Sequence, residues 1–165
     1  MEHMKTVLGN GMALRPSGKD DLPFVSDCIR STLEASVPEE EASLSNLWSD
    51  ITVTVALDSL SSRKMDDEVF ILTDGKDRKG FLWLGTSRDQ YNAESVGYVL
   101  GIYVIPELRR KGIGSELIGC AETWCRDKGF LTMQLDVGEA NAPAMSMYGS
   151  LGYGRRSSVL TKQLK

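Results

Sequence analysis

The segment Val104–Leu117, which reads VIPELRRKGIGSEL, constrains the fold of this 165-residue chain more than any other. An apolar run ends at Pro106, three consecutive cations follow, and two glycines open an amphipathic helical pattern. The cations are Arg109, Arg110 and Lys111, and the glycines are Gly112 and Gly114. Glycines allow close backbone approach, and the free N–H groups at a helix start attract anions. The segment therefore predicts a strand, a phosphate-binding loop and a helix in direct succession.

Other interpretations of this loop fit the residues less well. A basic triplet in isolation is more often a solvated charge run beside a turn, but the unbroken order of strand, proline, cations, glycines and helix favours a ligand site. The loop matches neither common phosphate fingerprint, because a dinucleotide-binding loop needs a third glycine where Leu117 stands and no GxxxxGK(S/T) motif occurs. A small molecule with a diphosphate group is therefore the expected ligand.

Composition narrows the class of protein. The formal net charge of -4 argues against a protein whose main role is to bind a nucleic-acid backbone, so no nucleic-acid partner is expected. The three cysteines lack CxxC spacing, which predicts buried free thiols, no metal site and a cytoplasmic location. No apolar segment reaches the length of a membrane span, and residues 1–10 lack a signal-peptide core, so no membrane partner is expected.

Histidine chemistry is also excluded by the sequence. The one histidine is His3, in a terminal stretch, residues 1–10, that is expected to be flexible. Catalytic triads with histidine and histidine proton shuttles are therefore not expected. Proton transfer would fall to carboxylates, tyrosines, cysteines, lysines or water.

The first half of the chain predicts helices and a hairpin. A short strand is expected over Met12–Arg15 and a helix over about Asp20–Ala35. A second helical pattern is carried by Leu44, Leu47, Trp48, Ile51 and Val55. Val69–Thr73 and Phe81–Leu84 are typical of two strands joined by a turn.

The second half alternates strands and helices. Val96–Ile105 is apolar enough for a central strand, and the loop above leads into a helix that ends at Gly129. Leu131–Val137 alternates as a strand with one face in the core, and Asn141 starts a helix that closes at Gly152. A last strand is expected over about Ser157–Leu164. This order predicts a mixed α/β sheet flanked by helices.

Two blocks resemble a known family. The pattern (Q/R)xxGx(G/A) at Arg109–Gly114 resembles the acetyl-CoA loop of the GNAT superfamily of N-acetyltransferases. Leu135–Tyr153, which reads LDVGEANAPAMSMYGSLGY, resembles the family's strand, its Asn-started helix and its YxxxG(F/Y) ending. The two blocks cover about Val96–Tyr153. The resemblance implies one α/β domain over residues 1–165, with a mixed, largely antiparallel sheet that is flanked by helices and splayed at its central strands.

The resemblance also implies roles for particular residues. The pantetheine arm of acetyl-CoA would bind the backbone of Ile102, Tyr103 and Val104, and a backbone N–H near Val104 would polarise the thioester carbonyl. The diphosphate would be held by Arg109, Arg110, Lys111, Gly112, Ile113, Gly114 and Ser115. Asn141 matches an asparagine that contacts the arm, and Tyr148 matches a tyrosine that protonates or hydrogen-bonds the departing thiolate. Without the motif, Asn141 would be a helix cap and Tyr148 a packed core residue.

The general base is expected among the carboxylates. Lysine-directed histone enzymes of this family carry a glutamate about where this chain has Tyr98, a departure that weakens a histone-type interpretation. Asp136 is the preferred base, because it resembles the acidic position of ribosomal-protein N-terminal acetyltransferases and lies opposite the core face of its strand. The alternative is a carboxylate that is simply exposed or paired at a strand end. Glu94, acting through water, is the reserve candidate.

These observations predict an acetyl-CoA-dependent N-acetyltransferase that works by direct attack in a ternary complex. The acceptor would be an amine-bearing small molecule or a peptide N-terminus, and the acidic residues Glu34 and Glu39–Glu41 could attract it, although a solvated face is the simpler explanation for them. A short tail after Tyr153 suggests an open acceptor side that a second subunit of a homodimer could complete. The alternative prediction is a non-catalytic acyl-CoA-binding or regulatory module.

Overall fold

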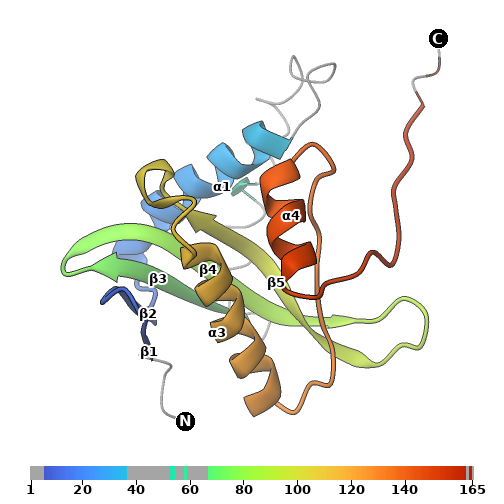
Figure 1. Ribbon diagram of the computed structural model, residues 1–165, viewed down its shortest axis with the longest axis horizontal. Coiled ribbons are helices and arrows are strands. Elements are labelled where there is room, and N and C mark those ends of the chain that lie inside the picture. The colour runs from blue at the N-terminus through green and yellow to red at the C-terminus, as the bar shows by residue number, and fades with distance from the viewer. Residues whose placement is uncertain (1–5, 37–52, 55–57, 59–66, 163, 165) are drawn as a thin grey trace.

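The computed structural model describes residues 6–36, 53, 54, 58, 67–162 and 164. These residues form a six-stranded sheet in the order β1-β2-β3-β4-β5-β6 (Figure 1). The strands are β1 (Thr6–Val7), β2 (Ala13–Pro16), β3 (Glu68–Asp74), β4 (Asp77–Arg88), β5 (Ser95–Val104) and β6 (Met133–Leu135). The helices are η1 (Lys19–Asp21), α1 (Leu22–Ser36), η3 (Pro106–Leu108), α3 (Ile113–Asp127) and α4 (Ala142–Ser150). Each described pair of strands is antiparallel except β5–β6, which confirms the mixed α/β sheet expected from the sequence.

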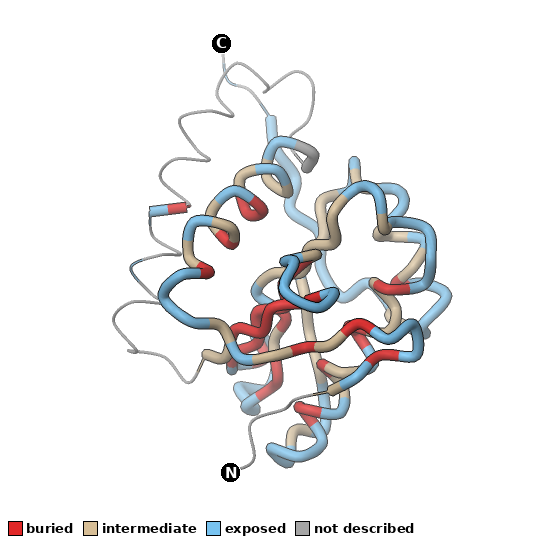
Figure 2. The backbone as a smooth tube through the Cα atoms, turned by 90° about the vertical axis from the view of Figure 1, so that its left-hand side faces the viewer, coloured by how far each residue is buried: buried red, intermediate tan, exposed pale blue. Residues whose placement is uncertain are grey.

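Helices α3 and α1 cover opposite faces of the sheet. The core beneath α3 contains Leu117 of the helix and Leu82 of β4, and the core beneath α1 contains Val25 of the helix and Phe81 of β4. Phe81 and Leu82 enter different cores because successive strand residues point to opposite faces. In Figure 2 the buried residues gather in the middle of the molecule, on the strands and on the inner sides of the helices.

The sheet opens beside β5. Strand β5 pairs with β4 along most of its length, with a bulge at Leu100, because Trp83 pairs with Gly101 while Leu84 pairs with Val99. Strand β6 pairs with β5 over three residues, and the last pair joins Val99 and Leu135. Beyond this pair the two strands separate, so the outer edge of the second half of β5 has no neighbouring strand among the described residues. This is the splay that the family resemblance implied.

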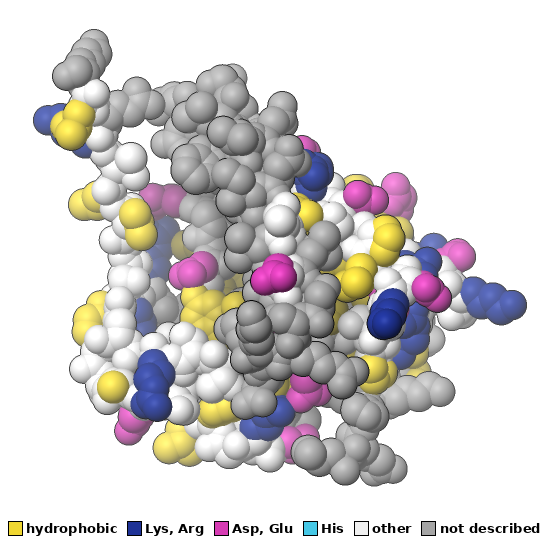
Figure 3. All heavy atoms as spheres, turned by 180° about the vertical axis from the view of Figure 1, so that it is seen from behind, with side chains coloured by type: hydrophobic (Ala, Val, Ile, Leu, Met, Phe, Trp, Pro, Cys, Tyr) yellow, Lys and Arg dark blue, Asp and Glu magenta, His cyan; other side chains and the backbone are white. Residues whose placement is uncertain are grey.

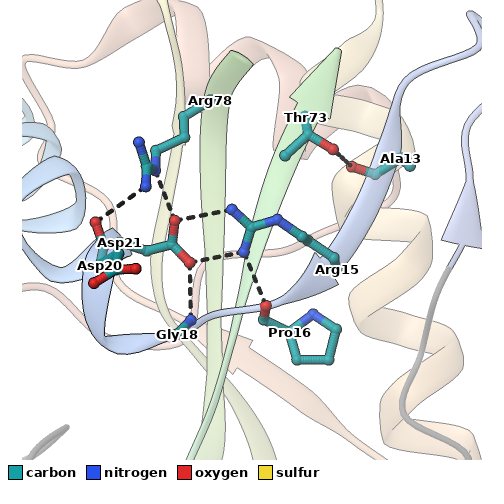
Figure 4. A network of polar contacts seen from close by, with 8 residues as sticks. All are labelled: Ala13, Arg15, Pro16, Gly18, Asp20, Asp21, Thr73 and Arg78. Carbon is teal, nitrogen blue, oxygen red and sulfur yellow. Dashed lines mark hydrogen bonds and ion pairs between the residues drawn. The ribbon is translucent and has the colours of Figure 1, made fainter. Parts of the chain in front are cut away.

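A buried carboxylate attaches the start of α1 to the sheet. Asp21 is 2% exposed and lies between two guanidinium groups, with Arg15 Nη1 at 2.7 Å and Arg78 Nε at 2.6 Å (Figure 4). The backbone N–H of Gly18 donates a third hydrogen bond to the carboxylate. The hydrogen bond from Arg15 is the main reason that the pKa of Asp21 lies well below its usual range, with Gly18 and Arg78 acting in the same direction against burial. The network ties α1 to β2 and β4 and so fixes the helix beside the opening of the sheet.

The expected last strand is not found in the described C-terminal residues. The prediction of a strand over Ser157–Leu164 is wrong for the described part of that stretch, which carries no strand. Arg156 instead donates to the buried carboxylate of Asp89, and Val159 and Leu160 are almost fully exposed. Figure 3 shows apolar side chains along this tail standing away from the rest of the molecule. A segment forms a stable strand only where a neighbouring strand edge is available for pairing.

Smaller differences occur elsewhere. The structure adds β1, and Leu8 beside it is buried, so packing begins inside the terminal stretch that was expected to be flexible. The second helical pattern of the first half lies mostly outside the described residues, although Val53 and Thr54 are helical. Cys28 and Cys125 are buried free thiols, whereas Cys120 is half-buried. None of the described helices is both long and apolar enough to cross a membrane.

Candidate active site

A cleft of about 780 Å³ lies where β5 and β6 separate. Its walls come from the second half of β5, the loop that follows it, the start of α3, the end of β6 and helix α4, and Ser31 and Thr32 of α1 close one side. The cleft is therefore a direct result of the early end of the β5–β6 ladder at Val99 and Leu135. Most of the residues that the sequence predicted for cofactor binding meet here, although they come from separate parts of the chain.

The loop between β5 and α3 has the backbone shape of an anion-binding nest. Arg110 and Gly112 both have left-handed backbone angles, with φ of 63° and 80°, on either side of Lys111. Alternation of this kind turns successive N–H groups toward one point, and the first N–H groups of α3 add to it because helix geometry leaves them without partners. A non-glycine residue rarely adopts a positive φ, so the conformation of Arg110 costs about 1–2 kcal/mol that the surrounding loop must offset.

Arg109 lies near the start of this loop, where its side chain contacts the end of β5. Its Nε donates to the carbonyl oxygen of Val104 at 3.0 Å, and its guanidinium carbon lies 5.3 Å from the centre of the Tyr103 ring. Both contacts are with the end of β5, so the side chain bridges the strand and the loop. Arg109 and Arg110 line the cleft and give this end of it a positive charge.

Helix α4 forms the opposite wall. Asn141 caps the helix, accepting a hydrogen bond from the backbone N–H of Ala144 at 3.3 Å, and it also lines the cleft. The cap role considered for Asn141 is therefore confirmed, and its amide nitrogen remains available for a second contact. The α3 and α4 walls approach closely at Gly114, where an added Cβ would lie 2.9 Å from Met147 Sδ.

Tyr148 is the most buried titratable side chain of this wall. It is 7% exposed, it packs edge-on against Tyr153 with ring centres 5.8 Å apart, and it still lines the cleft. Burial raises the pKa of Tyr148, because a phenolate would lose its hydration there. The phenol therefore stays protonated at neutral pH and can donate a proton.

Asp136 lies where the sheet opens, one residue after the last β5–β6 pair. It lines the cleft, and its Oδ2 accepts a hydrogen bond from the hydroxyl of Tyr98 at 2.6 Å. Tyr98 is not among the residues that line the cleft. Both residues stand out in the sequence, but their pairing was not predicted from it.

The structure does not bring every predicted residue to the cleft. Lys111 and Ile113 are absent from its lining, and the side chain of Ile113 is buried in the core beneath α3. Glu94, the reserve base, lies in the β4–β5 loop, where it accepts from Asn92 at 3.2 Å, and it also does not line the cleft. Ser31 and Thr32 were not predicted from the sequence, because the face that α1 turns toward the opening is polar and gives no periodic signal.

The described residues contain no group of three histidine, cysteine, aspartate or glutamate side chains placed to hold a metal ion. The cleft thus offers backbone N–H groups, guanidinium groups, one carboxylate and phenols. This donor set suits a phosphate-bearing ligand and proton transfer.

Comparison with known sequences identifies relatives. The chain is 33% identical over 86 residues to the mycothiol acetyltransferase of Segniliparus rotundus. The aligned segment covers 52% of this chain and 32% of that protein. It is 34% identical over 65 residues to aminoglycoside N(6')-acetyltransferase type 1 of Acinetobacter haemolyticus. That alignment covers 39% of this chain and 45% of the relative. The chain spans less than half the length of these curated relatives.

Solved structures share the fold. The GCN5-related N-acetyltransferase of Ralstonia eutropha JMP134 superposes with a TM-score of 0.75 at 20% identity, over 93% of this chain and 99% of that one. The aminoglycoside N-acetyltransferase AAC(6')-Iy, in complex with the bisubstrate analogue CoA-S-monomethyl-acetylneamine, superposes with a TM-score of 0.62 at 20% identity, over 93% and 98%. At such identities the likeness concerns the fold alone.

The profile of one protein family matches most of the chain. It extends over residues 33–153 and includes the loop, the opening between β5 and β6, and helix α4. This chain therefore belongs to the acetyltransferase (GNAT) family.

Proposed function

We propose that this protein is an acetyl-CoA-dependent N-acetyltransferase that transfers the acetyl group to a primary amine by direct attack in a ternary complex. The observation that carries the proposal is the continuity of the cleft, which runs from the nest at Arg110 and Gly112 past the free edge of β5 to Tyr148 and Asp136. One bound thioester could reach from the anion site to the proton donor.

The anion end of the cleft fits the diphosphate of CoA. The donor set consists of backbone N–H groups from Gly112 to Ser115 and the guanidinium groups of Arg109 and Arg110. Gly112 adopts a positive φ of 80°, lines the cleft, and has no atom within 4 Å of the position that a Cβ would take. The positive end of the α3 dipole adds to this attraction. Lys111 would contribute long-range charge.

The free edge of β5 fits the pantetheine arm. Past the bulge at Leu100, the edge of Ile102–Val104 that faces the cleft has no strand partner among the described residues, although β4 pairs with the other edge. An unpaired strand edge presents N–H and C=O groups that an amide-bearing chain can bind as an extra strand would. Asn141 faces the same space from α4 and would donate its side-chain amide to the arm.

The reaction needs a base for the amine and an acid for the thiolate. At pH 7 an amine of pKa about 10.4 is neutral at only a few parts in ten thousand, so a carboxylate that removes its proton speeds the reaction. We assign this role to Asp136. The amine nitrogen then forms the C–N bond with the thioester carbon, and a backbone N–H near Val104 stabilises the oxyanion.

Collapse of the tetrahedral intermediate breaks the C–S bond. The leaving thiolate takes the phenolic proton of Tyr148, and the proton gained by Asp136 returns to Tyr148 through water. The nitrogen of the new amide loses its second proton to solvent water, so one proton of the ammonium ends on the CoA thiol, one is released, and the charges balance. Burial keeps the Tyr148 phenol protonated until this step. The chemistry requires no covalent enzyme intermediate.

The acceptor is proposed to be a primary amine of a small molecule or of a peptide N-terminus. The names of the relatives, a mycothiol acetyltransferase and aminoglycoside acetyltransferases, support small molecules. The polar residues Ser31 and Thr32 of α1 close the cleft on the side of Asp136 and would contact the acceptor.

Two measurements test the function. Calorimetry with CoA should give a saturable heat, and its absence at millimolar CoA would contradict ligand binding at this site. A mass-spectrometric screen with acetyl-CoA should then find, in a panel of peptides, polyamines and aminosugars, a product heavier by the mass of an acetyl group that replaces hydrogen. Binding of CoA without turnover of any acceptor would favour the alternative of a non-catalytic acyl-CoA-binding module.

A further inference from the structure

We propose that Tyr98 is a positioning residue that orients the carboxylate of Asp136 for proton transfer from the acceptor amine. The proposal rests on the N-acetyltransferase function above. It concerns a residue that does not line the cleft and therefore acts through its neighbour.

The ladder between β5 and β6 sets this geometry. Tyr98 pairs with Gln134 in the parallel ladder, and Asp136 follows Gln134 by two residues, so the three side chains share one face of the sheet. The Tyr98 hydroxyl spans this diagonal and donates to Asp136 Oδ2 at 2.6 Å. The hydrogen bond thus connects the paired part of β5 to the first residue after β6.

The shared face is the one covered by α1. Tyr98 pairs across β4 with Gly85, two residues after Trp83, which belongs to the core beneath α1. Asp136 therefore lies on the side of the sheet from which Ser31 and Thr32 of α1 reach the cleft. This is the side on which the acceptor would enter, so the placement suits a base.

A single strong donor on one carboxylate oxygen has a defined effect. It holds Oδ2 in place and leaves Oδ1 for the amine, which limits rotation of a side chain at the end of a short strand. Burial, and secondly the contact with Asp136, raise the pKa of Tyr98, so the hydroxyl keeps its proton as a donor at neutral pH.

Other titratable and charged groups come from several elements around this pair, among them Asp67, which accepts a hydrogen bond from Trp83 Nε1 on the same face of the sheet. Tyr103 of β5, Arg109 and Arg110 of the loop and Tyr148 of α4 line the same cleft. On the outer side, Asp89 of the β4–β5 loop is paired with Arg156, and Glu139 after β6 is paired with Arg155. The two outer carboxylates are thus bound by their own arginines, whereas Asp136 accepts its hydrogen bond from the neutral hydroxyl of Tyr98.

The competing explanation is purely structural. The same hydrogen bond could simply fasten the end of β6 to β5, since their ladder has only three residue pairs. A structural role would lower the melting temperature and leave kcat unchanged wherever the variant is folded. A positioning role would lower kcat in the folded variant, and this effect would disappear once the Asp136 carboxylate is removed.

The test compares Tyr98→Phe, Asp136→Asn and the double variant in the full chain, with Tyr91→Phe as the matched control. Tyr91 also donates a hydroxyl hydrogen bond, to the carbonyl oxygen of Arg156 at 3.1 Å, but lies outside the cleft. For each variant, kcat, KM and their pH profiles are measured with the best acceptor from the screen. CoA affinity by calorimetry and thermal unfolding report on binding and folding.

In Tyr98→Phe, kcat at pH 7 should fall roughly tenfold, the usual effect of losing one hydrogen bond to a charged group. The loss should appear in kcat rather than in the KM of the acceptor, because Asp136 is misplaced while the acceptor still binds. The CoA dissociation constant and the Tyr91→Phe profile should stay unchanged. In the Asp136→Asn background, the Tyr98 substitution should have almost no further effect on kcat.

Two results would overturn the inference while leaving the proposed function intact. One is a wild-type kcat in Tyr98→Phe, whether or not the melting temperature falls. The other is full additivity of the two substitutions. Should the wild-type protein bind CoA and acetylate no amine, the function and the inference would both be rejected, and this outcome is visible before any variant is made.

Discussion

Gly114 of α3 and Met147 of α4 lie so close that a Cβ on the glycine would be 2.9 Å from the methionine sulfur. This contact joins the two helices that form opposite walls of the cleft, beside the anion-binding loop. The second glycine of the loop therefore has a packing role in addition to any contact with a ligand.

Gly114→Ala should weaken CoA binding more than it weakens the fold. The sulfur lies near the flexible end of Met147 and can move aside, so the free energy of unfolding should fall by less than about 1 kcal/mol. The displaced side chain and the new methyl group narrow the cleft, and the CoA dissociation constant should rise several-fold in calorimetry. Gly119→Ala, in the same helix with no atom near its added Cβ, is the control and should bind CoA normally. Equal affinity in both variants would contradict this role for Gly114.

Asp21→Asn should destabilise the protein in a pH-dependent way. Breaking this buried ion network should cost about 2–4 kcal/mol at pH 7 in urea unfolding. The pKa of Asp21 is lowered in the folded protein, so its stabilisation is fully present above the unfolded value near 4 and is lost as the pH falls below it. The gap between wild type and variant should therefore shrink between pH 5 and pH 3. A gap that is constant over this range would show that the carboxylate charge contributes nothing.

Tyr148→Phe should reduce turnover and leave CoA affinity unchanged. Loss of the proton donor for the thiolate should lower kcat by a factor of about 10² to 10⁴ at pH 7, whereas the ring packing against Tyr153 is kept. Because the pKa of Tyr148 is raised by burial, the wild-type enzyme should show no loss of activity from this group below about pH 10. Steady-state kinetics and CoA calorimetry provide the two readouts. A variant with normal kcat would remove Tyr148 from the mechanism.

Arg109→Ala should weaken CoA binding by roughly three- to tenfold and make that binding less sensitive to salt. Arg109→Lys should recover only part of the affinity, because a lysine cannot keep both the Val104 contact and a planar guanidinium toward the phosphates. Arg126→Ala is the matched control, since Arg126 is an exposed cation of α3, paired with Glu122 outside the cleft. The measurement is CoA titration at two salt concentrations. Identical losses in the Arg109 and Arg126 variants would indicate a general charge effect only.

Thiol labelling should separate the cysteines by burial. Burial raises the pKa of Cys28 to about 12 and that of Cys125 to about 11, so both should react with a disulfide reagent at pH 8 only when the protein unfolds. Cys120 is half-buried and should react first, at least about tenfold faster. Mass spectrometry of the labelled peptides identifies the site, and Cys120→Ser should remove the fast phase. Early labelling of Cys28 would contradict its packing in the core between α1 and the sheet.

Short-range signals were enough to predict the loop that precedes α3 and the start of helix α4. The glycine pair, the cations and the helical period of Ile113 and Leu117 are contiguous, and they place the loop at the start of α3. Asn141 was recognisable as a cap because its role depends only on the residues next to it. The family resemblance likewise depends on contiguous motifs.

Long-range packing determines which residues line the cleft together and which side chains are hydrogen-bonded to one another. The hydrogen bond between Tyr98 and Asp136 joins residues 38 positions apart and depends on the register of a parallel ladder, which no local pattern specifies. The missing last strand has the same cause, because a strand is stable only where an edge accepts it, and the tail is held at Arg156 by Asp89 instead. Sequence patterns limit which secondary structure a segment can form, whereas long-range pairing and burial select the one that it does form. The energies of pairing and burial depend on neighbouring segments that come together only when the chain folds.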